Sequence, residues 1–332
     1  SNYIHLLRKC MAEQFPQVPV LSLNFAGLEK DCSLELTPAL CLKMVYAVLY
    51  ADLLMTLYNQ CRPYELNEGE SQQVLDAWQE KLPKLFESNK FLSAEKTYAQ
   101  ILKDFAAIPR SKKPKIKVGI IGEIYVKYSP LGNNDLEKFL ESQDCEVNLP
   151  GLMGFVEYCV ANYKLDIDLY GGNKLVAGGA DKFLGWLDGI GCASYDAMRK
   201  YGFYAPGSFR ELMKKPEGII SLGAKMGEGW LLTAEMIELV QGGYGNIVCA
   251  QPFGCLPNHI VGKGMVNKIR ALYPSANITP IDYDPSATKV NQENRIKLML
   301  AVAKERLNAP AEAKPLTAEE IAGGAPRVET TV

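Results

Sequence analysis

The hydrophobic and polar positions in the C-terminal half of the chain alternate between helical spacing and short apolar stretches. They predict a helix over 229–241, a strand over 246–252, a helix over 260–272, a strand over 277–282 and a helix over 287–306. This order is typical of parallel strands joined by right-handed crossovers. The expected fold class is therefore α/β, with Rossmann-like parallel-sheet lobes in three layers and an additional helical segment.

The N-terminal third has mainly helical spacing. Residues 3–11 have the pattern of an amphipathic helix, residues 18–25 that of a strand, and residues 26–27 that of a turn. Polar helices are expected around 69–82 and 93–107. Because helical spacing begins at once, we expect the chain to be a fragment of a longer protein.

The longest apolar stretch, residues 39–58, has about the length that crosses a bilayer. It contains Lys43 and Asp52, whose charges would lie inside the hydrocarbon, so we expect a core helix that is buried on most sides. Thr37 with Pro38 provides its start.

A polar, basic segment flanked by prolines, residues 109–115, is the best candidate for a linker. The apolar stretch that follows it, residues 116–123, has the pattern with which a doubly wound domain begins. We therefore expect a partial α/β lobe with a buried helix over 1–110, completed by residues upstream, and a Rossmann-like lobe over 111–308. Residues 309–332 have the composition of a flexible tail.

Three features between these stretches are less regular. Asn133 or Asn134 is expected to cap a helix, and the residues around Val147 are expected to form another short strand. Residues 165–215 are rich in glycine, aromatic and charged residues, and their spacing predicts helical pieces without defined bounds.

Composition narrows the classes of partner. The 332 residues are 48% hydrophobic, and the 36 basic and 38 acidic side chains are not gathered into long blocks. This balance argues against a nucleic-acid surface and against a polybasic membrane patch, and favours small molecules and proteins as partners. The nine cysteines include no C-x-x-C pair, and no signal peptide precedes them, so we expect a cytoplasmic protein.

Cys255 has the most informative surroundings of these cysteines because it follows the strand predicted over 246–252. Ligands of parallel sheets bind at the carboxyl ends of the strands. Gly254 allows unusual backbone angles, and Asn258 or His259 can begin the next helix, near whose N-terminus a thiolate is favoured. A thiolate binds metals or attacks carbon, although a tight turn with an inward-facing thiol fits the same local features.

Other candidates each have a structural alternative. Glu123, which follows Gly122 at the end of a predicted strand, either faces the same crevice or caps a helix. His259 either transfers protons and binds anions or caps a helix. Cys249 has the surroundings of a core residue, whereas Cys192, in a glycine-rich stretch, is the second candidate for a functional thiol.

Asp282 and Asp284 follow the strand predicted over 277–282 and either serve the site or, as we favour, cap the next helix. The motifs G-x-G-x-x-G, G-x-x-x-x-G-K-[ST], G-x-S-x-G and H-E-x-x-H do not occur. A self-contained dinucleotide, ATP or zinc-protease enzyme is therefore not expected.

Several stretches together resemble the C-terminal part of the large activase-related proteins, which are similar to the 2-hydroxyglutaryl-CoA dehydratase subunit family. The stretches are "VPVLSLNFAGLE" (18–29), "RPYE" (62–65), "VGIIGEIYVKYSPLGNNDLEKFLE" (118–141), "QPFGCLPNHIVGKGM" (251–265) and "IDYDPSATKVNQENRIKLML" (281–300). The likeness is most specific in the last three and is absent from the tail.

This resemblance implies an oxygen-sensitive iron–sulfur protein, with a [4Fe–4S] cluster, that receives an electron from an ATP-dependent activase and dehydrates or reduces an acyl-CoA thioester by radical chemistry. It implies that Cys255 is a metal ligand and that Gly122, Gly254 and Asn258 adjoin the cofactor. Glu123 and His259 are the implied catalytic residues.

The chain departs from this pattern in its ligands. A cluster takes about three or four cysteines, and no closely spaced set occurs here. We expect the other ligands upstream of Ser1, so that the chain is part of a lyase and inactive alone; whether Cys192 or Cys32 replaces one of them is left open.

Two other functions fit the same residues. The first is a non-catalytic docking lobe that binds the activase and transmits its nucleotide state. The second is a thiol enzyme in which Cys255 is the nucleophile and His259 the base, although no third orienting group is evident.

Overall fold

The computed structural model describes residues 2–20, 23–24, 27–28, 37–284 and 286–308. Cys32 and the tail expected over 309–332 lie outside the described residues. The chain divides into two compact units, residues 1–48 and residues 49–332. Only the second unit contains the candidate site.

The first unit contains helix α1 (Asn2–Gln14) and a short antiparallel hairpin of β1 (Leu23–Asn24) and β2 (Gly27–Leu28). The helix confirms the amphipathic pattern at the N-terminus. Of the strand expected over 18–25, the described part is β1; residues 21, 22, 25 and 26 lie outside the described residues.

Helix α2 (Pro38–Cys61) begins at the predicted proline. From residue 49 to residue 61, which belong to the second unit, only Ala51 is exposed, so this part is the core helix that the sequence predicts. Among the described residues, the helical stretch 38–64 is long enough to cross a membrane and contains an 18-residue window with a mean hydropathy of 1.7. Core helices of globular proteins meet the same criterion.

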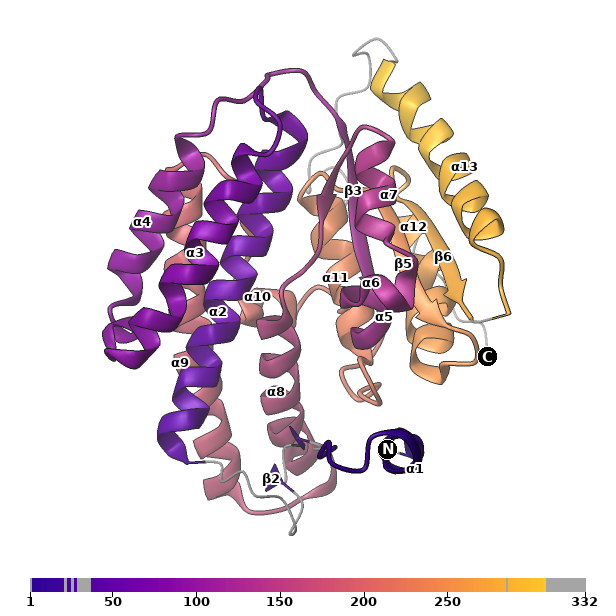
Figure 1. The fold of residues 1–332 in the computed structure, drawn as a ribbon. Helices are drawn as coiled ribbons and strands as arrows, with labels where there is room; N and C mark the ends of the chain where they lie inside the picture. The colour runs from indigo at the N-terminus through magenta and orange to yellow at the C-terminus, as the bar shows by residue number, and fades with distance from the viewer. Residues whose placement is uncertain (1, 21–22, 25–26, 29–36, 285, 309–332) are drawn as a thin grey trace, which may run out of the picture. The chain divides into compact units, whose positions relative to one another are not determined.

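Two further helices, α3 (Glu70–Glu87) and α4 (Ala94–Ala106), confirm the pattern over 69–82 and 93–107. Tyr50 of α2 contacts both helices, since its ring centroid lies 6.2 Å from that of Phe86 in α3 and 5.7 Å from that of Tyr98 in α4. An extended segment then leads from α4 to the first strand of the sheet (Figure 1).

The sheet consists of four parallel strands in the order β4-β3-β5-β6. The strands are β3 (Ile116–Gly122), β4 (Cys145–Asn148), β5 (Asn246–Pro252) and β6 (Asn277–Tyr283). The α/β fold class is thus confirmed, with 65% of the residues in helices. The chain first moves from β3 to β4 on one side and later returns to β5 on the other, so the order of strands reverses between β3 and β5.

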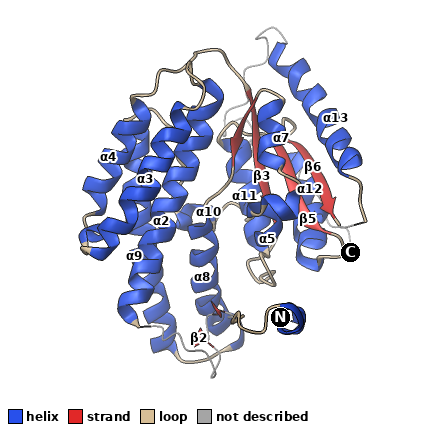
Figure 2. Ribbon diagram, viewed as in Figure 1, coloured by secondary structure: helices blue, strands red, loops and turns tan. Residues whose placement is uncertain are grey.

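Helices cover both faces of this sheet, which gives the predicted three layers (Figure 2). Alternate residues of β3 face opposite layers, as Ile120 and Ile121 show. One face packs against α5 (Ile124–Tyr128), α7 (Leu136–Ser142) and α13 (Lys289–Asn308). The opposite face packs against α11 (Trp230–Gln241) and α12 (Val266–Leu272).

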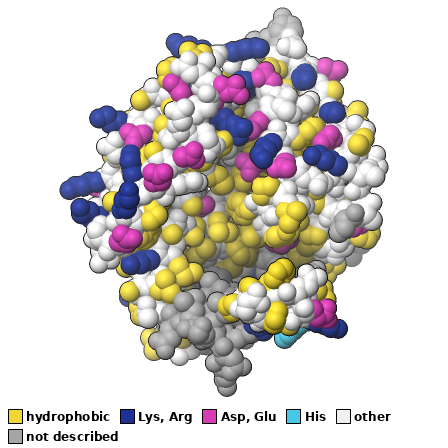
Figure 3. Space-filling view, in the orientation of Figure 1, with side chains coloured by type: hydrophobic (Ala, Val, Ile, Leu, Met, Phe, Trp, Pro, Cys, Tyr) yellow, Lys and Arg dark blue, Asp and Glu magenta, His cyan; other side chains and the backbone are white. Residues whose placement is uncertain are grey.

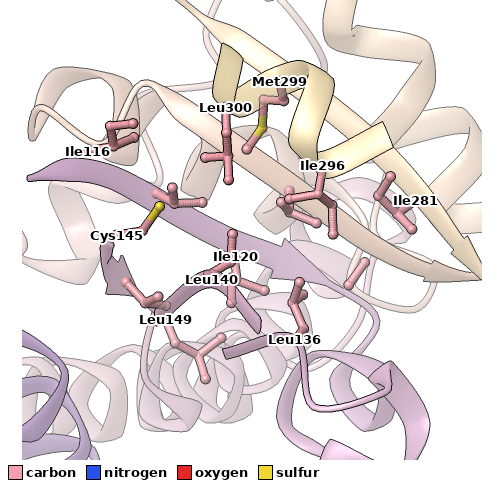
Figure 4. Packing of buried hydrophobic residues seen from close by; sticks show 14 of the residues in the cluster. Ile116, Ile120, Leu136, Leu140, Cys145, Leu149, Ile281, Ile296, Met299 and Leu300 are labelled. Atoms are coloured by element: carbon pink, nitrogen blue, oxygen red, sulfur yellow. The ribbon is translucent and has the colours of Figure 1, made fainter. Parts of the chain in front are cut away.

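The first of these cores joins segments that are far apart in sequence (Figure 4). Leu136 and Leu140 of α7 and Ile296 and Leu300 of α13 meet Ile120 of β3 in one cluster. The N-cap position of α7 is Asp135 rather than the expected Asn133 or Asn134. Asn133, at the end of the short helix α6 (Pro130–Asn133), still stabilises the start of α7, because its Oδ1 accepts a hydrogen bond of 3.1 Å from the Leu136 N–H.

The segment that the sequence left unassigned contains the end of the long helix α8 (Leu152–Tyr170), all of the long helix α9 (Lys174–Lys200) and the short α10 (Phe209–Leu212). Asn173 caps α9, since its Oδ1 accepts a 2.9 Å hydrogen bond from the Leu175 N–H. Glycines within α9 weaken its local helical signal, and packing of its buried face against α8 and α4 supplies the missing stability.

Candidate functional site

The candidate site lies at the carboxyl ends of β3 and β5, where the order of strands reverses. Such a reversal point is where open parallel sheets bind their ligands. Gly122 has a φ of 147°, and a Cβ on it would lie 1.8 Å from the Ala250 carbonyl oxygen. Only glycine allows the two strand ends to approach this closely. The next residue, Glu123, donates its N–H to the same carbonyl at 3.1 Å.

Cys255 follows β5 in a tight turn. Gly254 has the left-handed backbone that its sequence predicts, with a φ of 75°, and the Cys255 N–H donates to the Pro252 carbonyl at 3.2 Å. The chain becomes helical directly after Cys255 and passes through a π-helical turn at Asn258–Gly262 before α12. Single π-helical turns are costly and occur often at functional sites.

A buried amide lies behind the thiol. Asn258 is fully buried, and its Nδ2 donates to Cys255 Sγ at 3.3 Å and to Glu228 Oε2 at 3.2 Å. Glu228 Oε1 in turn accepts from the Ile124 N–H at 3.2 Å. This chain of hydrogen bonds joins the loop after β5 to the loop after β3. In the described part of the molecule, Asn258 Oδ1 has no hydrogen-bond partner although it is buried.

Burial raises the pKa of the Glu228 carboxyl, against the opposing effect of its backbone hydrogen bonds. Glu228 is not among the site residues predicted from the sequence. Its signal is weak but present, because Glu228 is an acidic residue between Gly227 and Gly229, just before helix α11.

Glu123 has a local role. Its Oε2 accepts a hydrogen bond of 2.9 Å from the Val126 N–H, so it caps α5, which was the structural alternative considered for it. Its backbone nevertheless places it beside the Ile124 N–H that Glu228 binds.

The His259 ring faces Gln251 of β5 and Asp282 of β6 rather than the thiol of Cys255. Its Nδ1 lies 2.9 Å from the Cys255 carbonyl oxygen, and its Nε2 lies 3.4 Å from Gln251 Nε2 and 3.5 Å from Asp282 Oδ1. In the neutral tautomer assigned from these partners, Nδ1–H donates to the carbonyl and Nε2 accepts from the Gln251 amide. The ring is therefore held by the backbone of Cys255, and no hydrogen bond joins it to Sγ.

Asp282, which lies within β6, and Asp284, which follows it, have different positions. Asp282 belongs to the site, because its Oδ1 accepts a 2.7 Å hydrogen bond from Gln251 Nε2. Asp284 is half-buried and accepts from the N–H of Ser286 at 3.1 Å, a bond that lowers the pKa of Asp284. Because α13 begins only at Lys289, this bond stabilises the preceding turn and is not the helix cap that we favoured for Asp284.

The other named thiols are structural. Cys249 is completely buried in β5, and this burial raises its pKa strongly, as expected of a core residue. The expectation for Cys192 was wrong: it lies within α9 and not in a glycine-rich loop, and its Sγ is 3.6 Å from Asp188 Oδ1. Burial and this carboxylate raise the pKa of Cys192 to about 12, which keeps it a thiol.

An iron–sulfur cluster is not accommodated by these residues alone. In the part of the chain that the structure describes, no group of three or more His, Cys, Asp or Glu side chains could hold a metal ion. Cys255 is half-buried at a strand end and fits the role of one ligand, whereas a cluster takes about three or four.

Exposed apolar side chains surround this thiol. Phe253 and Leu256 flank it in sequence and are 73% and 68% exposed. Ile260 follows one helical turn after Leu256, and Met226 lies on an adjoining loop, since a Cβ at Gly227 would be 2.8 Å from Pro257 Cγ. Together Met226, Phe253, Leu256 and Ile260 form what we term the apolar rim.

The fold and this site define a parallel α/β protein with a thiol-bearing loop at the reversal point of its sheet. Comparisons with protein-family models, curated proteins and solved structures found no match to the chain.

Proposed function

We propose that this chain binds its ligand at the carboxyl ends of β3 and β5 with the Cys255 thiolate, as an iron–sulfur component of the 2-hydroxyacyl-CoA dehydratase and activase system. The observation that carries the proposal is the fully buried Asn258 amide, which donates to Cys255 Sγ. Donors aimed at a sulfur are typical of thiolates that bind a metal, and they tune the site.

The family resemblance supplies the chemical class of this proposal. It implies an ATP-dependent activase as the partner and an acyl-CoA thioester as the substrate. Because the described residues provide one thiolate, the remaining ligands must come from another chain, from small thiols or from residues outside the described ones.

Iron uptake tests the proposal. After anaerobic incubation with ferrous iron, sulfide and glutathione to supply the missing thiolates, we expect the wild-type chain to bind iron and the Cys255→Ala variant to lose most of it. Cys192→Ala is the matched control, because Cys192 is also partly exposed but is held as a thiol in α9. Iron and sulfide per chain and the visible charge-transfer absorption are the measurements. Equal iron in wild type and Cys255→Ala would contradict a ligand role for this cysteine.

The apolar rim favours a second candidate, a non-catalytic docking lobe that binds the activase. Four large exposed apolar side chains around one loop are the kind of surface that a protein partner covers.

One pair of variants distinguishes the docking function from the metal-binding function. In a pull-down with an ATP-dependent activase, a docking lobe should keep binding after Cys255→Ser and lose at least about tenfold in affinity after Phe253→Asp, which places a charge in the rim. Leu131→Asp, a similarly exposed apolar position on α6, is the control. Loss of binding after Cys255→Ser with retention after Phe253→Asp would contradict docking through the rim.

A further inference from the structure

A second site is indicated by a partly open cavity of about 90 Å³ in the unit formed by residues 49–332. Residues from α2, α8, α9, α10 and α11 line it, together with the turn after β4. Figure 3 shows hydrophobic side chains gathered in the middle of the drawn face, over α10 and α11. The cavity shares no lining residue with the Cys255 site.

Four carboxyl groups line this mainly apolar cavity, and three of them are bonded within the protein. Asp52 accepts from the N–H groups of Leu152 and Met153 at 2.9 and 2.8 Å, and so caps α8. Glu235 forms a buried ion pair with Lys127, whose Nζ lies 3.1 Å from Oε1.

The remaining carboxyl group, that of Glu157, has no partner among the described residues. Its side chain is on the inner face of α8, is 4% exposed, and lines the cavity without a hydrogen bond or ion pair in the described structure. A buried carboxyl group without a partner is costly and is rare unless it serves a ligand.

The surroundings of Glu157 are short of positive charge. Asp52 and Asp188 lie close enough to repel its carboxylate, and with burial, the largest cause, they raise the pKa of Glu157 to about 8. Tyr195, whose pKa burial also raises, lines the same space as a neutral phenol. Among the described residues, no lysine, arginine or histidine lines the cavity, and Lys127 is already paired with Glu235.

The remaining acidic residue in the lining, Glu238, also has its own cation. Glu238 Oε2 is paired with Lys215 Nζ at 2.8 Å, so it leaves no cation for Glu157. The feature that the cavity lacks is therefore a compact positive charge with hydrogen-bond donors, attached to a small apolar body.

We propose that this cavity binds a small organic cation with a primary ammonium group, held by Glu157 and Asp52, with its apolar part against Leu53, Met153 and Phe209. A volume of about 90 Å³ gives room for roughly six water-sized groups, which suits a short alkylammonium. This binding site is independent of the function proposed for Cys255.

The test uses n-propylammonium as the probe and 1-propanol with equimolar sodium chloride as its neutral counterpart. At about ten times its dissociation constant, propylammonium should raise the midpoint of thermal unfolding by about 2–4 °C at pH 7. Titration calorimetry in phosphate and in Tris should show release of nearly one proton per ligand, because the bound cation converts Glu157 to its carboxylate.

Two variants that act in different ways test whether the thermal shift comes from binding in the cavity. Glu157→Gln removes the charge, and Gly154→Leu fills the cavity, because a Cβ at Gly154 meets no atom within 4 Å. Both should abolish the thermal shift, whereas Glu80→Gln, at an exposed carboxylate on α3, should preserve it. An equal shift with 1-propanol, or a full shift retained in Glu157→Gln, would overturn the proposal and leave the cavity as a water-filled space.

Discussion

Replacing Glu157 with glutamine should raise the free energy of unfolding by about 4 kcal/mol at pH 8 and leave it nearly unchanged at pH 4.5. Glutamine has the shape of the protonated carboxyl group, so the packing of α8 around the cavity is retained. The change removes only the titration of a group that is 4% exposed and has no partner.

The direction follows from linkage between protonation and folding. Burial, followed by repulsion from Asp188 and Asp52, raises the pKa of Glu157 from 4.5 to about 8. Between these two values the folded chain keeps a proton that the unfolded chain has lost. Wild-type stability therefore falls as the pH rises through this window, and Glu157→Gln lacks this loss.

Urea denaturation of both proteins at pH 4.5, 6 and 8 measures the effect. Asp52, whose pKa burial raises to about 6, contributes a similar loss in both proteins and cancels in the comparison. The exposed Glu80→Gln variant should follow the wild type at every pH. A constant difference between Glu157→Gln and wild type across this range would mean that Glu157 titrates as an ordinary exposed glutamate.

An unpaired carboxyl group that lowers stability at neutral pH is a cost that the fold bears at this one position. Such local costs are typical of sites shaped for a ligand rather than for stability. The stabilisation expected from Glu157→Gln and the loss of propylammonium binding expected from the same variant are thus two consequences of one feature.

The sheet could be predicted from sequence because its strands are short apolar stretches bounded by turn residues. Both β3 and β5 begin and end within one residue of their predicted bounds. The long helices α8 and α9 could not, because the glycines of α9 remove the local signal and the packing partners that restore it lie elsewhere in the chain. For the same reason, the sequence did not show that Cys192 lies within a helix.

Some residues of the candidate sites could likewise be predicted from the local sequence, whereas others are brought together only by the tertiary fold. Cys255 and Glu123 follow predicted strands directly, so parallel pairing alone brings their loops to one edge of the sheet. Glu228 joins Asn258 across 30 residues, and Asp52 joins Leu152 across 100, and no local spacing encodes either contact. Asp52 could be recognised as an oddity within an apolar helix, but its role as the cap of α8 required the tertiary fold.

Replacing Lys127 with methionine should lower the free energy of unfolding by about 3–5 kcal/mol. The side chains of Lys127 and Glu235 are 2% and 6% exposed, and the replacement leaves Glu235 without its cation in the wall of the cavity. Part of the loss should be recovered at low pH, because burial already raises the pKa of Glu235 and protonation then removes its charge.

The second replacement in a double-mutant cycle distinguishes a buried pair from general disruption. Lys127→Met with Glu235→Leu should regain most of the lost stability, since both charges are then absent and the volume is retained. Lys164→Met is the matched control, because Lys164 and Asp168 form an exposed pair one turn apart on α8 and should contribute less than about 1 kcal/mol. If Lys127→Met costs no more than Lys164→Met, water reaches Glu235, and the cavity is then too polar to favour the small organic cation proposed for it.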